Sequence, residues 1–92
     1  MHLGVVPPGA AATPHKHDGH ETAIYVLRGR AGMDYGDRLE HRIEAGAGDF
    51  VYIAAGVPHR PFNLSDTEPV EYLVARTDPH QEESVVLLPE LG

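Results

Sequence analysis

Glycine and proline are the residues that most restrict the fold of this chain, because ten glycines and eight prolines occur among its 92 residues. Glycine adopts turn conformations at little cost, whereas proline fixes one backbone angle and removes a hydrogen-bond donor. So many of both residues in a short chain favour frequent turns and short strands over long helices.

Segments rich in β-branched and aromatic residues lie between these turns. We expect strands or extended segments at residues 1–6, 10–17, 22–28, 31–35, 38–44, 50–53, 59–63, 70–76 and 85–88. Gly36 and Asp37 predict a two-residue hairpin loop between the fourth and fifth of these segments. About seven or eight short strands, separated by turn residues and without an internal repeat, imply an all-β sandwich or barrel.

The length of the chain fits a single domain over residues 1–92. A core of this size gives only marginal stability, which a bound metal or a dimer partner would increase. The short apolar segment 1–6, ended by Pro7 and Pro8, is typical of an edge strand that pairs with another chain. We therefore expect a homodimer.

The net charge of −7 argues against nucleic acid and anionic membrane surfaces as partners. No apolar run approaches the roughly 18 residues of a transmembrane helix. The start of the sequence also lacks the charged and apolar regions of a signal peptide. We expect a soluble, cytoplasmic protein whose partner is a small molecule.

Three histidines and a glutamate occur close together, at His15, His17, His20 and Glu21. Alternate residues of an extended segment project to the same face, so His15 and His17 can bind one metal ion from a single strand. Neutral imidazole nitrogens are good ligands for divalent first-row metals. Because the chain has no cysteine, histidine and carboxylate side chains must hold any metal.

Two sequence motifs resemble those of a known family of small β-barrels. The first is a glycine, five residues, H-x-H, three or four residues, a glutamate, six residues and a glycine. Its first half is matched by Gly9, His15 and His17.

The second motif is a glycine, five residues, P-x-G, two residues, a histidine, three residues and an asparagine. It is matched by Gly48, Gly56, His59 and Asn63, with Ala54 in place of the first proline. With both motifs, the chain resembles a small, single-domain bacterial cupin. The resemblance implies an all-β cupin barrel, also described as a double-stranded β-helix or jelly roll.

The resemblance also implies one divalent transition metal ion, of Fe, Mn, Ni or Zn, bound inside the barrel. Its implied ligands are His15, His17, Glu21 and His59. Open positions on such an ion allow water, oxygen or a chelating substrate to bind.

The match to the first motif fails at its glutamate. Counting back from Gly29 places Thr22 at that position, while Glu21 lies one residue earlier and on the opposite face of a regular strand. Three alternatives follow: a β-bulge turns Glu21 inward, His20 supplies another imidazole, or Thr22 leaves three histidines and water around the metal. We favour Glu21 as the fourth ligand.

The reaction is left open by the sequence. The resemblance implies a metal-dependent enzyme, dioxygenase-like or isomerase- or lyase-like, acting on a small polar metabolite. Its catalytic residues are not assigned, and Tyr25 and Tyr52 are candidate acids or bases by residue type alone. The alternative is a non-catalytic cupin module that binds a small ligand or senses a metal, because a fold does not fix a function.

A sugar-phosphate isomerase is less favoured, because it would need a basic cluster near the pocket. Only Arg60, with Arg28 or Arg76, is available to supply one. Asn63 is interpreted as a turn residue rather than a catalytic group. The other histidines, His2, His41 and His80, are interpreted as solvated or hydrogen-bonded side chains.

Overall fold

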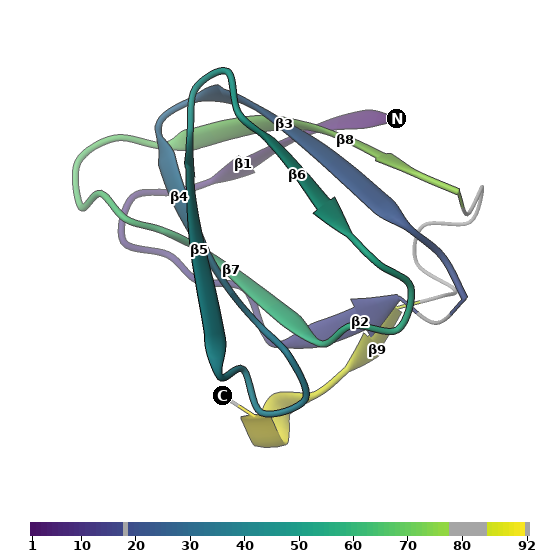
Figure 1. The fold of residues 1–92 in the computed structure, drawn as a ribbon. Coiled ribbons are helices and arrows are strands. Elements are labelled where there is room, and N and C mark those ends of the chain that lie inside the picture. The colour runs from purple at the N-terminus through teal and green to yellow at the C-terminus, as the bar shows by residue number, and fades with distance from the viewer. Residues whose placement is uncertain (18, 78–84, 92) are drawn as a thin grey trace.

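The computed structural model describes residues 1–17, 19–77 and 85–91, with the side chains of His17 and Val85 outside that description. Two antiparallel sheets enclose the interior of the molecule (Figure 1). The only helical turn in these ranges is a 3-10 helix at Pro89–Leu91. The structure is therefore all-β, as the turn-rich sequence predicted.

The first sheet has four strands. Their spatial order is β1 (His2–Val6), β8 (Val70–Arg76), β3 (Thr22–Arg28) and β6 (Phe50–Ile53). The strand β1 ends this order, which agrees with the prediction of an edge strand at the start of the sequence.

The second sheet has five strands. Their spatial order is β5 (His41–Gly46), β4 (Arg30–Tyr35), β7 (His59–Asn63), β2 (His15–His17) and β9 (Val85–Leu87). Most neighbours in both sheets are distant in sequence, so the fold depends on long-range pairing (Figure 1).

Alternation along β3 builds one wall of the interior. Thr22, Ile24 and Val26 face the inside, and the residues between them face outward. Val26 is 2% exposed and packs with Ala45 and Val70 in the hydrophobic core. The core therefore joins strands from both sheets.

The hairpin between β4 and β5 is present, but the prediction of a two-residue loop is wrong. Residues 36–40 form the loop, and the register places Met33 opposite Ile43. A two-residue loop would have placed Glu40 opposite Met33, on the inward face. The longer loop thus keeps an apolar pair inside and the carboxylate outside.

Four strands, β3, β6, β7 and β8, begin and end at the predicted residues. The predicted segment 10–17 forms a regular strand only at its end, while Ala10 and Ala12 join β7 through single backbone hydrogen bonds. The segment between β8 and β9 lies largely outside the described residues. Within the described ranges, no helix has the length and apolar character needed to cross a membrane.

Asn63 ties three separate segments together at the end of β7. Its amide Nδ2 lies 3.1 Å from the Val6 carbonyl, 3.2 Å from the Pro7 carbonyl and 2.7 Å from the Glu68 carbonyl. Its Oδ1 accepts a hydrogen bond of 2.8 Å from the Ser65 amide. The side chain is 8% exposed. The interpretation of this residue as a structural turn residue is therefore supported, since all these partners are main-chain groups.

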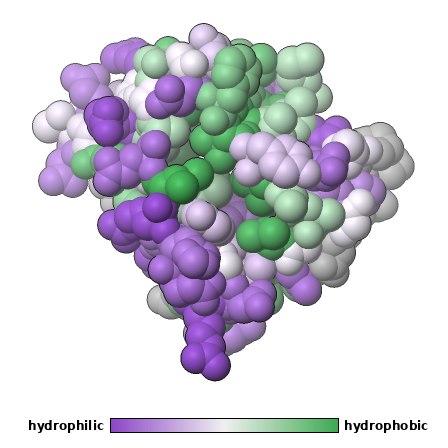
Figure 2. All heavy atoms as spheres, in the orientation of Figure 1, coloured by the Kyte–Doolittle hydropathy of each residue, from purple (hydrophilic) through white to green (hydrophobic). Residues whose placement is uncertain are grey.

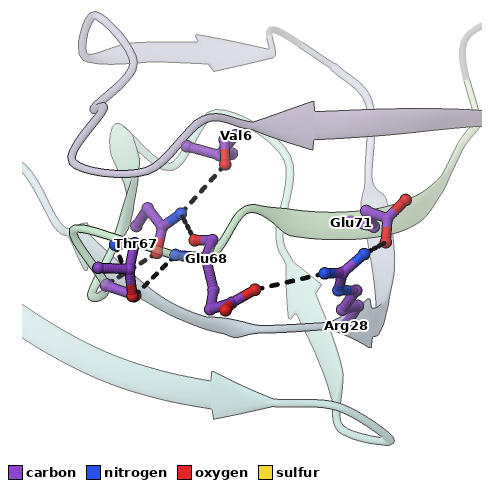
Figure 3. Close-up of polar contacts among 7 residues, drawn as sticks. Val6, Arg28, Thr67, Glu68 and Glu71 are labelled. Atoms are coloured by element: carbon purple, nitrogen blue, oxygen red, sulfur yellow. Dashed lines mark hydrogen bonds and ion pairs between the residues drawn. The ribbon is translucent and has the colours of Figure 1, made fainter.

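Arg28 extends this cluster across the surface (Figure 3). Its guanidinium lies 3.3 Å from the Glu68 carboxylate and 3.5 Å from the Glu71 carboxylate. All three side chains are largely exposed, so these ion pairs contribute little stability compared with the buried amide of Asn63.

Candidate metal and ligand site

His15 and His59 lie opposite each other on the neighbouring strands β2 and β7. Their ring centroids are 4.3 Å apart, and the ring planes meet at 61°. His59 is 2% exposed. The structure thus brings together two of the four predicted ligands, which are 44 residues apart in the sequence.

The hydrogen bonds of both rings define their tautomers. Nδ1 of His15 lies 2.8 Å from the Thr13 carbonyl, and Nδ1 of His59 lies 2.9 Å from the Val57 carbonyl. A carbonyl oxygen only accepts, so each Nδ1 must carry the proton and donate it. In the neutral form of each ring, Nε2 then holds the lone pair that a metal ion requires.

Burial keeps His59 neutral at physiological pH. Desolvation lowers its pKa from 6.5 to about 4, with smaller contributions from the neighbouring His15 and Arg76. The hydrogen bond to Val57 opposes this shift only in part. His59 is therefore a neutral imidazole at pH 7, which is the form that binds metals.

A cavity of about 340 Å³ lies between the two sheets, beside the histidine pair. Its polar lining residues are His15, Thr22, His59, Tyr72 and Arg76. The other lining residues are almost all aliphatic. Val5 and Ile43 line the cavity and are also exposed, so it opens to solvent. Apolar residues gather over the upper and central part of the face seen in Figure 2, with hydrophilic residues below and to the left.

Tyr72 reaches this cavity because β1 has a glycine beside it. A Cβ atom at Gly4 would overlap the ring of Tyr72, which pairs with it in register. The absence of a side chain at Gly4 therefore lets the Tyr72 ring lie against the backbone of β1.

Glu21 is not brought to the cavity. Its carboxylate accepts a hydrogen bond of 2.9 Å from the hydroxyl of Tyr52, which is 63% exposed. This contact raises the pKa of Tyr52. The carbonyl of Glu21 accepts a hydrogen bond from the Thr77 amide, and the amide of Glu21 donates to the Thr77 hydroxyl, so the chain at Glu21 stays joined to the end of β8. The bulge that would turn Glu21 inward is not at this position; the irregularity in β3 lies between Val26 and Arg28.

Thr22 occupies the inward position instead. It is 3% exposed, and its hydroxyl has no hydrogen-bond partner among the described residues. His20 lies just before β3 and is not one of the residues that line the cavity. The identity of a fourth ligand therefore stays a prediction. No group of three histidine, cysteine or acidic side chains lies close enough to hold a metal within the described set, which excludes the side chain of His17.

Of the three arginines that the sequence offers for a basic cluster near the pocket, only Arg76 lines the cavity. The Arg60 guanidinium lies 2.8 Å from the Asp34 carboxylate and does not line the cavity. Arg76 does line it, and alternation from the buried Val70 and Val74 along β8 was the signal that could have found it. Neither candidate tyrosine, Tyr25 nor Tyr52, lines the cavity.

Two of the remaining histidines fall within the described residues. His2 is half-buried, its Nδ1 has no hydrogen-bond partner among the described residues, and burial lowers its pKa. His41 is exposed and lies against the ring of Tyr35 at 5.1 Å, in agreement with a surface role. His80 lies outside the described residues.

Comparison with known proteins supports the assignment of the family. Residues 2–76 match the sequence profile of the cupin domain. The chain belongs to the cupin family. No curated protein sequence matches this cupin.

Solved structures resemble this cupin over most of its length. Oxalate decarboxylase of Bacillus subtilis, an enzyme with Mn(II) centers, has 27% identity and a TM-score of 0.79, over 94% of this chain and 22% of its own. The protein TT1209 of Thermus thermophilus has 30% identity and a TM-score of 0.69, over 80% of this chain and 67% of its own.

A third structure, from Klebsiella pneumoniae, has a double-stranded beta-helix domain. It has 22% identity and a TM-score of 0.76, over 92% of this chain and 70% of its own. At that identity the likeness shows the fold alone. The chain spans about a fifth of the length of the B. subtilis decarboxylase, so only the barrel is compared with that enzyme.

The residues of this cupin fit a divalent metal in one respect that the structure shows directly. The donor set provides two buried or half-buried imidazoles whose Nδ1 protons are held by backbone carbonyls. This second hydrogen bond orients a ligating imidazole and increases its basicity. His17 lies two residues after His15 in the same strand, at the position where alternation returns to the same face.

Proposed function

We propose that this cupin binds one divalent transition metal ion through His15, His17 and His59, and acts on a small molecule in the adjoining cavity. The observation that carries the proposal is the tautomer of His15 and His59, fixed by the carbonyls of Thr13 and Val57. The Mn(II) centers of the related oxalate decarboxylase make Mn a leading choice among Fe, Mn, Ni and Zn. We propose Glu21 as the fourth protein ligand, and the Glu21→Gln variant tests this assignment.

The bound ion would supply Lewis acidity to an oxygen atom of the substrate. The chain itself supplies a largely apolar wall that limits water, and a cluster of polar groups at one end. The hydroxyl of Tyr72 is the remaining acid or base by residue type inside the cavity. We infer a metal-dependent enzyme of dioxygenase or isomerase and lyase type.

A non-catalytic binding module is the second candidate, and one observation favours it. Tyr25 and Tyr52, the tyrosines that the sequence offered as acids or bases, face away from the cavity, and the lining contains no carboxylate within the described part of the chain. Consumption of oxygen by the metal-loaded protein in the presence of a diketone, a thiol or a catechol would favour the enzyme. Binding of such a compound without reaction would favour the module.

Metal content tests the proposed site. The His15→Ala, His59→Ala double variant should lose the roughly one equivalent of metal that the unmodified protein holds after incubation with Mn(II), Fe(II), Ni(II) or Zn(II), because two ligands are removed. Elemental analysis after gel filtration measures this loss.

Two single variants complete the metal test. His41→Ala is the matched control, since this exposed imidazole lies on the loop side of β5, and it should keep the metal. Glu21→Gln separates the alternatives for the fourth position: retained metal assigns that position to a group other than Glu21, and lost metal assigns it to Glu21. If the unmodified protein holds no metal under any of these conditions, the proposal fails.

We also propose that the outer face of the first sheet forms a homodimer. Leu3, Leu73, Tyr25 and Phe50 are successive cross-strand partners and make one apolar row over all four strands. Leu3 is 70% exposed and Phe50 is 80% exposed. A second copy is the partner that fits best, because this row can pack against the same row of a second copy about a two-fold axis.

The dimer is tested by light scattering coupled to gel filtration. Leu3→Glu and Phe50→Glu should each shift a dimeric mass toward the monomer, because a carboxylate would be buried at the contact. Leu64→Glu, at an exposed position in the turn before β8, should leave the mass unchanged. A monomeric mass for the unmodified protein throughout a dilution series would exclude this interface.

A further inference from the structure

We propose that Arg76 and Thr22 form a carboxylate-binding pair, and that the cavity selects a small organic anion with an apolar body. This inference rests on the proposed function for the location of the ligand, because it uses the same cavity. It adds the chemical class of the ligand and the two side chains that recognise it.

The register of the first sheet places the two side chains together. Thr22 on β3 pairs directly with Arg76 on β8, and both residues line the cavity. Residues directly opposite on antiparallel strands project to the same face, with Cβ atoms about 5 Å apart. A guanidinium and a hydroxyl therefore share one site on the cavity wall.

The hydroxyl of Thr22 is an independent sign of a ligand. It is buried in a residue that is 3% exposed, and it has no hydrogen-bond partner among the described residues. Buried hydroxyl groups are normally paired, because loss of hydration is otherwise uncompensated. A ligand oxygen in the cavity would accept this hydrogen bond.

The charge of the cavity wall points to an anion. Arg76 is the only arginine or lysine among the described residues that line the cavity, and no aspartate or glutamate of the described ranges lines it. The carboxylate of Glu21 faces outward to Tyr52. Arg76 thus places a positive charge on the cavity wall, in a chain of net charge −7. A divalent metal ion at the histidines would add further positive charge to this cavity.

The remaining wall defines the other part of the ligand. Ile24, Val26, Met33, Ile53 and Val74 line the cavity with aliphatic carbon. A volume of about 340 Å³ holds a small acid with a branched or ring-shaped body. Arginine binds a carboxylate through two parallel hydrogen bonds, which suits it to orient such an acid with its apolar part toward the aliphatic wall.

Binding of 3-methylbutanoate, compared with its neutral amide 3-methylbutanamide, tests this pair. We would follow chemical shifts of backbone amides by NMR titration, first with metal-free protein and then with Mn replaced by diamagnetic Zn(II). The carboxylate should bind at least about tenfold more tightly than the amide, because a charge-assisted pair is replaced by a neutral one. Shifts should centre on Thr22 and Arg76.

Variants then separate recognition from folding. Arg76→Met should weaken carboxylate binding by about tenfold or more, and Arg76→Lys should restore part of it. Thr22→Val should weaken binding severalfold without loss of thermal stability, because its hydroxyl has no partner in the described structure to lose. Arg28→Met is the matched control, since this exposed arginine lies outside the cavity, and it should bind normally.

The outcomes also distinguish this inference from the metal proposal. Equal binding of acid and amide, unchanged binding by Arg76→Met and Thr22→Val, or no binding with or without Zn(II) would each overturn the carboxylate pair. Binding that requires Zn(II) and is lost only in the histidine variants would support the metal site and overturn the role of Arg76. Binding by metal-free protein that is lost in Arg76→Met would support the pair even if the metal proposal failed.

Discussion

Replacement of Asn63 by alanine should lower the free energy of unfolding by about 3 kcal/mol, the largest stability effect that we expect from a single polar residue here. The Nδ2 group of Asn63 lies within hydrogen-bond distance of the carbonyls of Val6, Pro7 and Glu68, and its Oδ1 accepts a hydrogen bond from the amide of Ser65. These main-chain groups belong to two segments, the end of β1 with Pro7 and the turn before β8. Removal of the side chain leaves them without their partner at a site that is 8% exposed. Urea unfolding followed by circular dichroism measures the loss.

Two comparisons make the Asn63 prediction specific. Ser65→Ala removes an exposed hydroxyl that accepts from the amides of Thr67 and Glu68, and it should cost well under half as much. The folded Asn63→Ala protein should bind the proposed metal as the unmodified protein does, because the side chain bonds to the backbone and does not line the cavity. A loss below about 1 kcal/mol would show that water replaces the amide, and the structural role would then be rejected.

Replacement of Asp34 by asparagine should lower the free energy of unfolding by about 2 kcal/mol at pH 7. The Asp34 side chain is 8% exposed and lies 2.7 Å from Nε of Arg42 and 2.8 Å from Nη2 of Arg60. Arg42 also lies over the ring of Phe62 at 4.6 Å. Because Arg42 is largely exposed and regains water in the variant, the expected loss is smaller than for a fully buried ion pair.

The same carboxylate predicts a pH dependence. Hydrogen bonds from Arg42, and then from Arg60, hold the pKa of Asp34 below its ordinary value, although burial acts in the opposite direction. The unfolded chain therefore binds the proton first as the pH falls. The stability from this group is complete above about pH 4, the ordinary pKa of aspartate, and is lost as the pH falls through the folded pKa.

Unfolding of the unmodified protein and of Asp34→Asn should be measured in urea from neutral pH down to the acid transition. The difference in free energy between them should stay constant above pH 5 and shrink below pH 4. A difference that does not change with pH would mean that the charge of Asp34 contributes nothing. Arg30→Gln, which removes an exposed pair with Glu44, should show little difference at any pH.

Prediction of the fold succeeded where the signal was local. The strands β3, β6, β7 and β8 were bounded by turn residues that restrict the backbone wherever they occur. Prediction failed at the hairpin loop, where Gly36 and Asp37 suggested two residues and the structure has five. There, the pairing of Met33 with Ile43 on the inward face of β4 and β5 outweighed the preference for a short turn.

Prediction of the candidate site succeeded for the histidine pair and was incomplete for its surroundings. The spacing of His15 and His59 within two motifs anticipated their meeting, which the ladder of β2 and β7 produces. The favoured inward position of Glu21 is not what the structure shows, because its backbone is held by hydrogen bonds to Thr77 and its carboxylate lies beside the hydroxyl of Tyr52. Its role in metal binding remains a prediction for the Glu21→Gln variant.

The sequence by itself determined the all-β class, most strand boundaries and the alternation that puts Thr22 and Glu21 on opposite faces. These depend on backbone restrictions and on the two-residue period of a strand, which are local properties. Only the tertiary structure decided which face became the interior, and that Arg76 rather than Arg60 lines the cavity. Those outcomes depend on the register between strands distant in sequence, and the burial of the whole apolar set fixes that register.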